Sequence, residues 1–544
     1  MTSTNNQPPP LQDYDLFSSD RALLDAVERA APAMDRTEIS QLGVLAGDAG
    51  TIELGFDANR NTPELHTHDR FGERIDEVQF HPAYHALMCV AVTSGLHAAP
   101  WLDKEPNAHL RRAAKFFVWS QVEGGHLCPI SMTYAAVPAL EQAPLLAPQW
   151  IEKLAARCYD PRLVPVAEKE AAIVGMGMTE RQGGSDVRSN QTRATRTGNE
   201  NEYVLEGHKW FCSAPMSDAF LVLAQAEQGL SCFLVPRVLP DGARNPFAIQ
   251  RLKDKLGNRS NASSEVEFHA THGWLVGESG AGIQTIVNMV NATRLDCIIG
   301  SAALLRAALA QAIHHATYRR AFGAPLIDHA LMQNVLADLA LESEAATALF
   351  VRLAQAVDDA SYSAQAAALR RIGTAVGKFY VCKRAPAAVA EALECLGGNG
   401  YVEESIMPRL YREAPLNSIW EGSGNINALD VLRILQKQPA AVEALYEELT
   451  PALHDPRIAA AARKLRDDLA DEDVEWRARS LVERMALLWQ ASLLLVQAPN
   501  YVSDSFIASR LTPDGGRTIG TLPIKTGLRG IVDRAAPRHE VPAL

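Results

Sequence analysis

The chain has 544 residues, of which 47% are hydrophobic and 21% are charged, and it carries a net charge of −12 from 52 basic and 64 acidic side chains. This mixture is that of ordinary globular proteins, so it excludes a largely disordered, collagen-like or low-complexity chain. The length predicts several domains. The acidic balance excludes a uniformly basic nucleic-acid binder, although it leaves room for a local basic patch.

Cysteine usage and the apolar segments bear on the cellular compartment. Eight cysteines occur without any C-x-x-C motif, which predicts neither a disulfide framework nor a thiolate zinc site. The first ten residues, MTSTNNQPPP, lack the charged start and apolar run of a signal peptide. The best membrane candidate, residues 485–498, is shorter than the ~20 apolar residues that cross a bilayer, so it predicts a buried helix. We therefore expect a cytoplasmic protein without membrane contact.

Four segments of different texture predict a multidomain α+β fold. Residues 1–176 carry Ala, Leu and His at helical spacing and predict an N-terminal helical domain. Residues 177–284 contain short apolar runs between Gly, Asn, Pro and Asp, the pattern of an antiparallel β-domain. Residues 285–437 show apolar spacings of three and four that favour a four-helix bundle. Residues 438–544 predict an additional C-terminal helical domain that is a possible DNA-binding domain.

A glycine-rich loop lies at the first of these boundaries. It reads MGMTERQGGSD over residues 176–186, and its glycines would let backbone N–H groups approach a ligand while Thr179 and Ser185 add hydroxyls. It is not a Rossmann fingerprint, because β-texture follows it instead of a helix. An ordinary turn and a site for a phosphate or a heteroaromatic ring edge both fit this loop.

The next segment, GHKWFCS over residues 207–213, lies inside the β-domain. Adjacent aromatic residues on a strand point to opposite faces, so one of Trp210 and Phe211 could cover a planar ligand while the other enters the core. Plain core packing is the alternative. The following polar run, residues 255–263, predicts a turn into another strand.

Two further segments lie in the bundle. Residues 318–326, YRRAFGAPL, end a helix, and their arginines either complement the helix dipole or bind a phosphate. Residues 396–401, LGGNGY, are typical of a helix C-cap and turn.

The segment NSIWEGSGNI, residues 417–426, places Glu421 between an indole and a glycine turn. Burial against aromatic surface raises the pKa of a carboxyl group and makes it a better base near neutral pH. The glycines and Asn425 that follow resemble a cap for a helix over residues 426–437. A surface glutamate in a turn is the alternative.

Histidines between residues 66 and 85 raise the question of a metal site. His81 and His85 have i, i+4 spacing, but Pro82 stands where a zincin carries glutamate, and no acidic or cysteine partner follows at ligand spacing. We expect no metal.

Taken together, the segments resemble the acyl-CoA dehydrogenase family over about residues 165–437. The matching pieces occur in family order and spacing: MTERQGGSD, GHKWFCS, KLGNRSNASSEVEF, YRRAFGAPL, LGGNGY and IWEGSGN. RQGG, LKDKLGNRSNAS, NSIWEGSGN, the long N-terminal helical block and the extra C-terminal domain narrow the resemblance to the AidB branch, the alkylation-response flavoproteins. The resemblance implies bound FAD and a homotetramer.

The resemblance also implies roles for individual residues. Glu421 would be the catalytic base, which removes the α-proton of an acyl-CoA thioester while the β-hydrogen leaves as hydride to the flavin. Contacts with FAD are implied for Met178, Thr179, Gly184, Ser185, Phe211, Cys212, Ser213, Gly397, Gly398, Asn399, Gly400, Trp420, Gly422, Ser423, Gly424 and Asn425. Arg319 and Phe322 would reach the FAD of a neighbouring subunit. The expected activity is weak.

In the AidB branch the extra domain is associated with double-stranded DNA. Residues 510–544 hold six basic and three acidic side chains, a local charge of +3 in a chain of −12. The candidate phosphate contacts are Arg433, Lys437, Arg517, Lys525 and Arg529. A solvated tail is the alternative for the segment, and an ordinary short- or branched-chain acyl-CoA dehydrogenase without a DNA role is the alternative for the protein.

Overall fold

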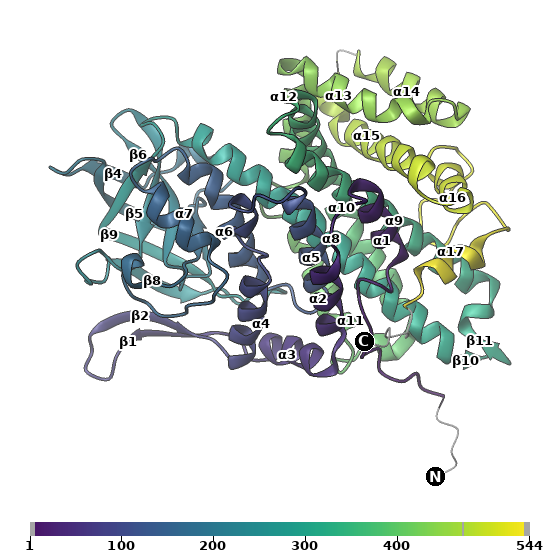
Figure 1. Ribbon diagram of the computed structural model, residues 1–544, viewed down its shortest axis with the longest axis horizontal. Coiled ribbons are helices and arrows are strands. Elements are labelled where there is room, and N and C mark those ends of the chain that lie inside the picture. The colour runs from purple at the N-terminus through teal and green to yellow at the C-terminus, as the bar shows by residue number, and fades with distance from the viewer. Residues whose placement is uncertain (1–5, 471–472, 538–544) are drawn as a thin grey trace, which may run out of the picture. The chain divides into compact units, whose positions relative to one another are not determined.

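The computed structural model describes residues 6–470 and 473–537, which form two compact units (Figure 1). Of the described residues, 6–52, 105–122, 294–470 and 473–537 form unit 1, and 53–104 and 123–293 form unit 2. This division differs from the four predicted segments. The N-terminal segment contributes to both units because its first helices pack against the long helices of unit 1, and the C-terminal segment belongs to unit 1 as well.

Unit 2 is built around a seven-stranded sheet. Its strands are β3 (Val174–Gly177), β4 (Arg193–Arg196), β5 (Glu202–Ser213), β6 (Ala219–Ala226), β7 (Gly229–Pro236), β8 (Phe247–Leu252) and β9 (Ser263–Val276). The order β6-β4-β5-β9-β7 closes on itself because β6 also pairs with β7, while β3 and β8 attach to β6 and β9. The predicted β-domain is thus confirmed as a closed barrel. It is not purely antiparallel, since β3 and β4 pair with β6 in parallel.

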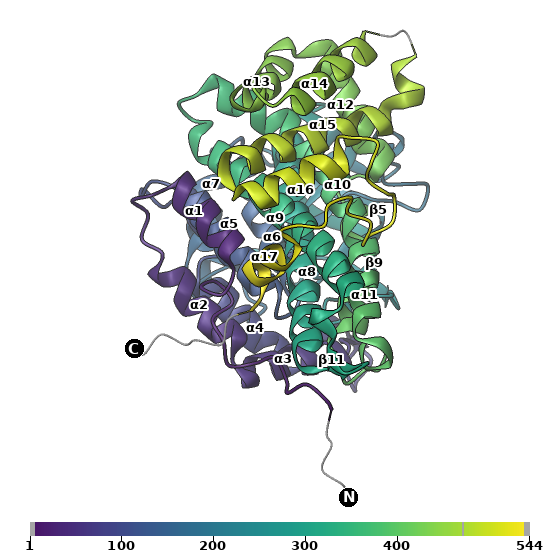
Figure 2. The ribbon, with the colours of Figure 1, turned by 90° about the vertical axis from the view of Figure 1, so that its right-hand side faces the viewer.

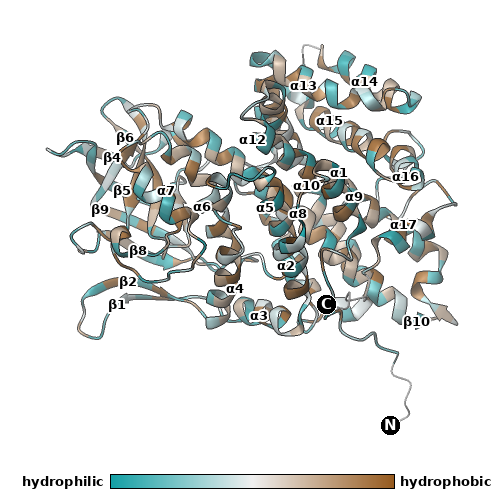
Figure 3. Cartoon of the chain, in the orientation of Figure 1, coloured by the Kyte–Doolittle hydropathy of each residue, from teal (hydrophilic) through white to brown (hydrophobic). Residues whose placement is uncertain are grey.

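Strand β6 shows why this barrel is stable. Six successive residues of β6 are buried, so both of its faces pack against apolar side chains. Phe220 stacks on Phe247 with ring centroids 4.9 Å apart, whereas Leu221 and Leu223 belong to a cluster with α6 (Leu127–Leu140). The almost wholly apolar sequence of α6 can be followed in Figure 3. Unit 2 also contains α4 (Pro82–Thr93) and α7 (Ala147–Ala155), in agreement with the helical spacing of the N-terminal segment.

The N-terminal segment is mainly helical, as predicted, but residues 64–79 form strands that were not predicted. There the chain forms a hairpin of β1 (Glu64–His68) and β2 (Arg74–Gln79), with Gly72 in the left-handed region at φ 87°. Exposure alternates along both strands, which is the period of a half-exposed ribbon. The hairpin contacts β8 of the same unit.

Unit 1 is helical. Its helices are α1 (Arg21–Ala30), α2 (Thr37–Gly47), α5 (Ala108–Ser120), α9 (Ala330–Asp359), α10 (Ala364–Cys395), α11 (Met407–Glu413), α12 (Gly424–Lys437), α13 (Pro439–Leu449), α14 (Pro456–Leu469), α15 (Val474–Gln497), α16 (Asn500–Arg510) and α17 (Leu528–Ala535). Helix α10 packs against α9, α11, α12, α13 and α15 and so occupies the middle of the unit. Two helices, α3 (Ala49–Arg60) and α8 (Gly282–Tyr318), have residues in both units.

The C-terminal segment is helical, as predicted, and α15 packs against α12, α13, α14 and α16 (Figure 2). The apolar stretch over residues 485–498 lies mostly in α15, where Trp489 and its neighbours are buried. That stretch is therefore a core helix, as expected. Among the described residues, one helix, α8, is long and apolar enough to cross a bilayer, and 89% of its most apolar window is buried.

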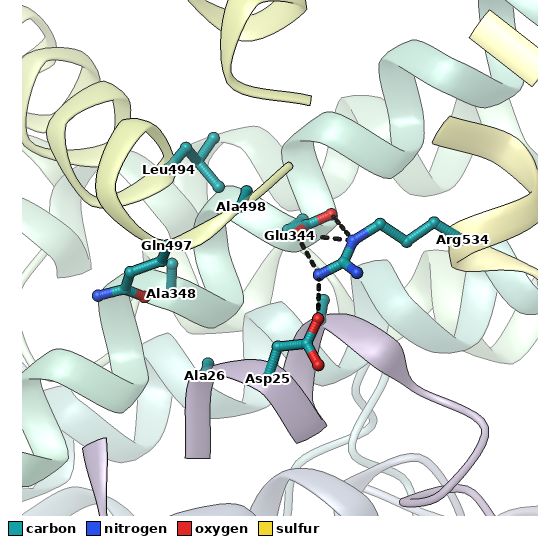
Figure 4. A pocket seen from close by; sticks show the side chains of 9 residues that line it. Asp25, Ala26, Glu344, Ala348, Leu494, Gln497, Ala498 and Arg534 are labelled. Atoms are coloured by element: carbon teal, nitrogen blue, oxygen red, sulfur yellow. Dashed lines mark hydrogen bonds and ion pairs between the residues drawn. The ribbon is translucent and has the colours of Figure 1, made fainter. Parts of the chain in front are cut away.

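Buried ion pairs attach the C-terminal segment to α9. Arg510 pairs with Asp338 and with Glu342, the latter at 2.7 Å. Arg534 donates to Glu344 at 2.9 Å and to Asp25 of α1 at 2.8 Å, at the edge of a small pocket (Figure 4). Burial raises the pKa of Glu344, and Arg534 opposes that rise. These arginines therefore neutralise acids that the fold has removed from water.

We expect Arg534→Met to lower the free energy of unfolding of unit 1 by about 3 kcal/mol, because it leaves the Glu344 carboxylate buried without its cation. Urea unfolding of the full chain measures this loss. Arg529→Met on the same helix is the matched control, since Arg529 pairs with Asp533 and Asp328 at an exposed site and its removal should cost less than about 1 kcal/mol. Equal losses in the two variants would contradict the expectation.

Candidate functional site

Glu421 lies in a strained turn of unit 1. A short 3-10 turn (Leu416–Ser418) precedes it, and α12 begins three residues later at Gly424. Glu421 has φ 56° and Gly422 has φ 95°, so two successive residues occupy the left-handed region. A non-glycine residue there costs of order 1–3 kcal/mol and persists only where its surroundings impose it. Such strain is typical of functional sites.

Side-chain donors hold all three carbonyl groups of this turn. The Lys378 ammonium donates to the carbonyl oxygens of Trp420 at 2.7 Å and Gly422 at 2.8 Å. Arg294 Nε donates to the carbonyl oxygen of Glu421 at 2.9 Å, and Asn427 Nδ2 donates to that of Gly422 at 2.7 Å. The turn is therefore fixed by α10, α8 and α12 at once.

Asp430 anchors the arginine of this arrangement. Arg294 and Arg371 both donate to its carboxylate, at 2.8 and 2.7 Å. Burial raises the pKa of Asp430, but hydrogen bonding and the charges of Arg371 and Arg294 outweigh it and leave the pKa below its usual value. Asp430 is therefore a lasting anion that keeps Arg294 directed at the Glu421 peptide.

Two other predicted segments of unit 1 come together. Helix α8 ends at Tyr318, and β10 (Arg320–Ala321) and β11 (Ala324–Pro325) form a tight hairpin with Phe322 at its tip, where the side chain is 98% exposed. Asn6 bonds to Arg319 and Arg320, and Gln7 accepts from Asn399 at 2.7 Å. The N-terminal residues thus link the hairpin to the 3-10 turn Gly397–Gly400. Near Gly397 and Gly398 a Cβ atom would meet nothing within 4 Å, so this backbone is open to a ligand.

In unit 2 the glycine-rich loop follows β3. Asn190 donates to the Met178 carbonyl at 3.0 Å, and the Trp210 N–H donates to that of Thr179 at 2.8 Å, so the first half of the loop is fixed against its own barrel. Gly184 lies against the Thr179 side chain, because a Cβ there would come within 2.5 Å of Thr179 Oγ1. Gly184 and Ser185 are exposed.

A fully buried ion pair that the sequence reading did not identify supports this loop. Lys209 Nζ donates to Glu180 Oε1 at 2.7 Å and to the Leu223 carbonyl at 2.7 Å, and neither side chain of the pair is exposed. Burial raises the pKa of Glu180, but Lys209 and the backbone N–H of Gln191 bring it down to about 2. The sequence held a signal for this burial. Lys209 is separated from Tyr203 and Leu205 by an even number of residues, so it points to the same buried face of the strand.

Strand β5 departs from the expected alternation of its aromatic residues. The pairing of β5 with β9 shifts register between Lys209 and Cys212. Both rings then face one cation: Lys253 Nζ lies 3.4 Å from the Trp210 centroid and 4.7 Å from that of Phe211. The prediction that the two rings lie on opposite faces is therefore wrong, because the β-bulge changes the parity.

The residues after Phe211 differ in what they offer to a ligand. Phe211 remains 48% exposed. Cys212 is fully buried, and burial raises the pKa of its thiol to about 12, so only its backbone is available. Ser213 is half-buried, and its hydroxyl lies 3.0 Å from that of Ser263.

The predicted DNA contacts differ in their surroundings. Arg433, Lys437, Arg517 and Lys525 are exposed, although Arg433 lies 3.5 Å from Asp430. Arg529 is paired with two aspartates. Arg510 and Arg534, which contributed to the local positive charge, are half-buried and paired with buried acids, and Arg538 and Glu540 lie outside the described residues.

The histidines noted in the sequence have partners within the protein. His81 caps α4 by accepting from the Ala83 N–H, His85 bonds to the Tyr159 hydroxyl at 2.9 Å, and His66 bonds to Gln79 at 3.2 Å. Over residues 6–470 and 473–537, no group of three or more His, Cys, Asp or Glu side chains could hold a metal ion.

Comparisons with known proteins agree with this architecture. Three family models match: the adaptive response protein AidB N-terminal domain over residues 6–161, the acyl-CoA dehydrogenase middle domain over 175–271, and the acyl-CoA dehydrogenase C-terminal domain over 280–436. The putative acyl-CoA dehydrogenase AidB of Escherichia coli is 47% identical over 515 residues, which cover 94% of each chain.

A more distant relative is similar over most of its length. Acyl-CoA dehydrogenase family member 11 of Caenorhabditis elegans is 28% identical over 91% of this chain and 85% of its own. The crystal structure of C. elegans ACDH-11 in complex with C11-CoA has a TM-score of 0.83, with 24% identity over 98% of this chain and 93% of that one. The latter likeness shows a shared fold.

Proposed function

Since the chain belongs to the acyl-CoA dehydrogenase family and to its AidB branch, we propose that it desaturates an acyl-CoA thioester between the α and β carbons with Glu421 as the base. Family membership makes the chain an FAD-dependent oxidoreductase that acts on acyl-CoA, as the motifs predicted. The observation that carries the assignment of Glu421 is the turn in which cationic side chains hold the carbonyl groups on both sides of this residue.

The residues present fit FAD. The open backbone at Gly397 and Gly398 and the exposed Phe322 can contact the dinucleotide. The exposed ring of Phe211 can cover part of the planar isoalloxazine ring. The family resemblance implies FAD contacts on each unit taken by itself. On unit 2 they are Met178, Thr179, Gly184, Ser185, Phe211, Ser213 and the Cys212 backbone, and on unit 1 they are Arg319, Phe322, residues 397–400, Trp420 and residues 422–425. When bound, FAD supplies the acceptor for a hydride from the β-carbon.

Glu421 supplies the proton transfer. Its carboxylate would take the α-proton of the thioester onto one Oε atom, and the fixed turn would keep that atom aimed at the α-carbon. A positioned base of this kind typically contributes ~10²–10⁴-fold to the rate. Because the turn is anchored at three carbonyl groups, little reorientation is needed when substrate binds.

Anaerobic titration of the purified holoenzyme with saturated acyl-CoA thioesters tests this function. We expect slow bleaching of the flavin and a product lighter by two hydrogens. The C. elegans relative was crystallised with C11-CoA, so the series includes an eleven-carbon chain beside short and branched ones. Colourless protein that takes up no FAD, or flavin that no thioester bleaches, would refute the proposal.

The assembly and the bundle are part of the same proposal. We infer a cytoplasmic homotetramer in which the hairpin bearing Arg319 and Phe322 reaches the FAD of a neighbouring subunit. The exposure of Phe322 supports this, because a fully exposed phenylalanine at a left-handed turn leaves apolar surface in water.

We propose that helices α8, α9, α10 and α12 form the four-helix bundle.

A second proposed function is duplex DNA binding in the alkylation response. The match to the adaptive response protein domain supports it, as do Arg433 and Lys437, which are exposed one turn apart on α12. Arg517 and Lys525 are the other exposed candidates. The ion pairs of Arg510, Arg529 and Arg534 weaken the case for a basic tail, since these charges are already neutralised.

We expect Arg433→Gln combined with Lys437→Gln to weaken duplex binding and to reduce the slope of log K against log salt by about two, close to 0.9 for each lost phosphate contact. Fluorescence anisotropy with a labelled duplex measures both quantities. Arg529→Gln is the matched control and should leave the slope unchanged, because its charge is paired. Absence of wild-type binding at about 50 mM salt would leave the ordinary dehydrogenase as the function.

A further inference from the structure

Lys378 holds the peptide groups on both sides of Glu421. Its Nζ atom lies 2.7 Å from the Trp420 oxygen and 2.8 Å from the Gly422 oxygen, so a single ammonium spans the residue between them. Asn427 Nδ2 also donates to the Gly422 carbonyl oxygen, at 2.7 Å, and Arg294 Nε donates to the Glu421 carbonyl oxygen. The side chain of Lys378 thus links the two ends of the turn.

The position of Lys378 in α10 is unusual for a lysine. It lies between Gly377 and Phe379 in a run of buried residues, and it is 1% exposed. A buried ammonium loses its hydration and is retained only where polar groups replace the water. Here the carbonyl groups of Trp420 and Gly422 replace the water, so Lys378 and the turn stabilise each other.

Resting on the proposed function, we propose that Lys378 is a positioning residue for Glu421: by holding the carbonyl groups of Trp420 and Gly422, its ammonium keeps the strained turn in the one conformation that aims the carboxylate. Neither the motifs nor the glycine turn identified it. A lone lysine in the apolar helical stretch AVGKFYVC was the signal available in the sequence.

The charges of Lys378 and Glu421 act on a common neighbour, the thiol of Cys297. Burial raises the pKa of the Cys297 thiol well above its usual value; the Lys378 ammonium opposes that rise and Glu421 adds to it. Both charges therefore act on the same thiol of α8. Other charged and titratable groups of the described residues lie around the turn: Arg294, Asp296, Arg371, Asp430, Cys382, Lys383 and Arg479.

Three substitutions separate the possible roles. Lys378→Met removes charge and donors at similar volume, Lys378→Gln keeps an N–H donor without charge, and Lys378→Arg keeps both. Lys464→Met, at an exposed lysine of α14, is the matched control. Each holoenzyme is assayed for FAD content and for hydrogen exchange of the peptide containing residues 419–427. kcat and KM are measured across pH with an artificial electron acceptor that reoxidises the flavin.

We expect Lys378→Met to lower kcat about 10–100-fold while KM changes less than threefold, because a displaced base costs rate more than binding. Exchange over residues 419–427 should become faster. The pH limb that reports the base should move upward in the Met and Gln variants, since loss of a nearby cation favours the protonated carboxyl. Arg should restore most of kcat, and Lys464→Met should behave like the wild type.

Two results would overturn the inference: a folded Met variant with kcat within threefold of wild type, or equal losses in all three Lys378 variants with no change in the pH limb. If the Met variant does not fold, the Gln and Arg variants decide by the same criteria. Glu421→Gln is measured in parallel. Full activity of that variant would refute the proposed function, whereas an inactive Glu421→Gln beside wild-type-like Lys378 variants would refute only the role of Lys378.

Discussion

We expect Glu421→Gln to reduce turnover of acyl-CoA by about 10²–10⁴-fold, the contribution of a positioned general base. The amide cannot accept the α-proton, yet it is nearly isosteric, so the turn and its bonds to Lys378 and Arg294 are expected to remain. Flavin bleaching in a stopped-flow instrument, with KM and FAD content measured on the same sample, gives the size of the effect.

The control for this variant is Glu403→Gln, because Glu403 is an exposed acid of the same unit paired with Arg412. It should leave turnover unchanged. Loss of FAD together with activity in Glu421→Gln would indicate that the residue holds the fold and not the proton. Undiminished turnover would remove Glu421 from the mechanism.

We expect Lys209→Met to lower the free energy of unfolding by about 3–5 kcal/mol, the cost of removing one partner from a fully buried ion pair. Glu180 would keep the backbone donors at Gln191 and Thr192 but lose its counter-charge. Because Glu180 belongs to the glycine-rich loop, FAD retention should fall as well. Urea unfolding and the flavin-to-protein absorbance ratio measure the two effects.

Adding Glu180→Gln to Lys209→Met should recover more than half of the loss, since a neutral amide is less costly to bury than an unpaired carboxylate. Arg60→Met removes an exposed pair with Glu53 in the same unit and is the matched control.

The free energy of unfolding should also depend on pH in the acid range. The pKa of Glu180 is about 2 when folded and 4.5 normally, so its contribution is complete above pH 4.5 and is lost as the pH falls toward 2. If the wild type and Glu180→Gln lost the same unfolding free energy as the pH fell from 4.5 toward 2, the result would contradict this.

Much of the fold could be predicted from local pattern. Apolar runs at 203–205, 220–223, 232–235 and 266–268 lie in β5, β6, β7 and β9, and the helix expected at 426–437 begins two residues earlier, at Gly424. These predictions succeed because alternation and helical spacing are properties of neighbouring residues. The parity of Trp210 and Phe211 could not be predicted, because it depends on a register shift against β9.

The site could be predicted only in part, for a similar reason. Glycines and the acid at Glu421 are visible in one short segment, but the lysine that holds this turn lies about forty residues earlier in another helix. Counting charges in the C-terminal tail gave a basic segment. It could not show that Arg510 and Arg534 have acids of α9 as partners, because pairing is decided by tertiary structure.

The arginine contacts of the C-terminal segment make that segment and α9 depend on each other. Asp338, Glu342 and Glu344 lie buried on α9, and Arg510 and Arg534 pair with them. Without the appended helices Asp338 and Glu344 would lose these arginines, whereas Glu342 would keep its pair with Arg384 of α10 at 3.0 Å. Removal of the appended helices should therefore destabilise α9 itself, because it leaves carboxylates buried without their cations.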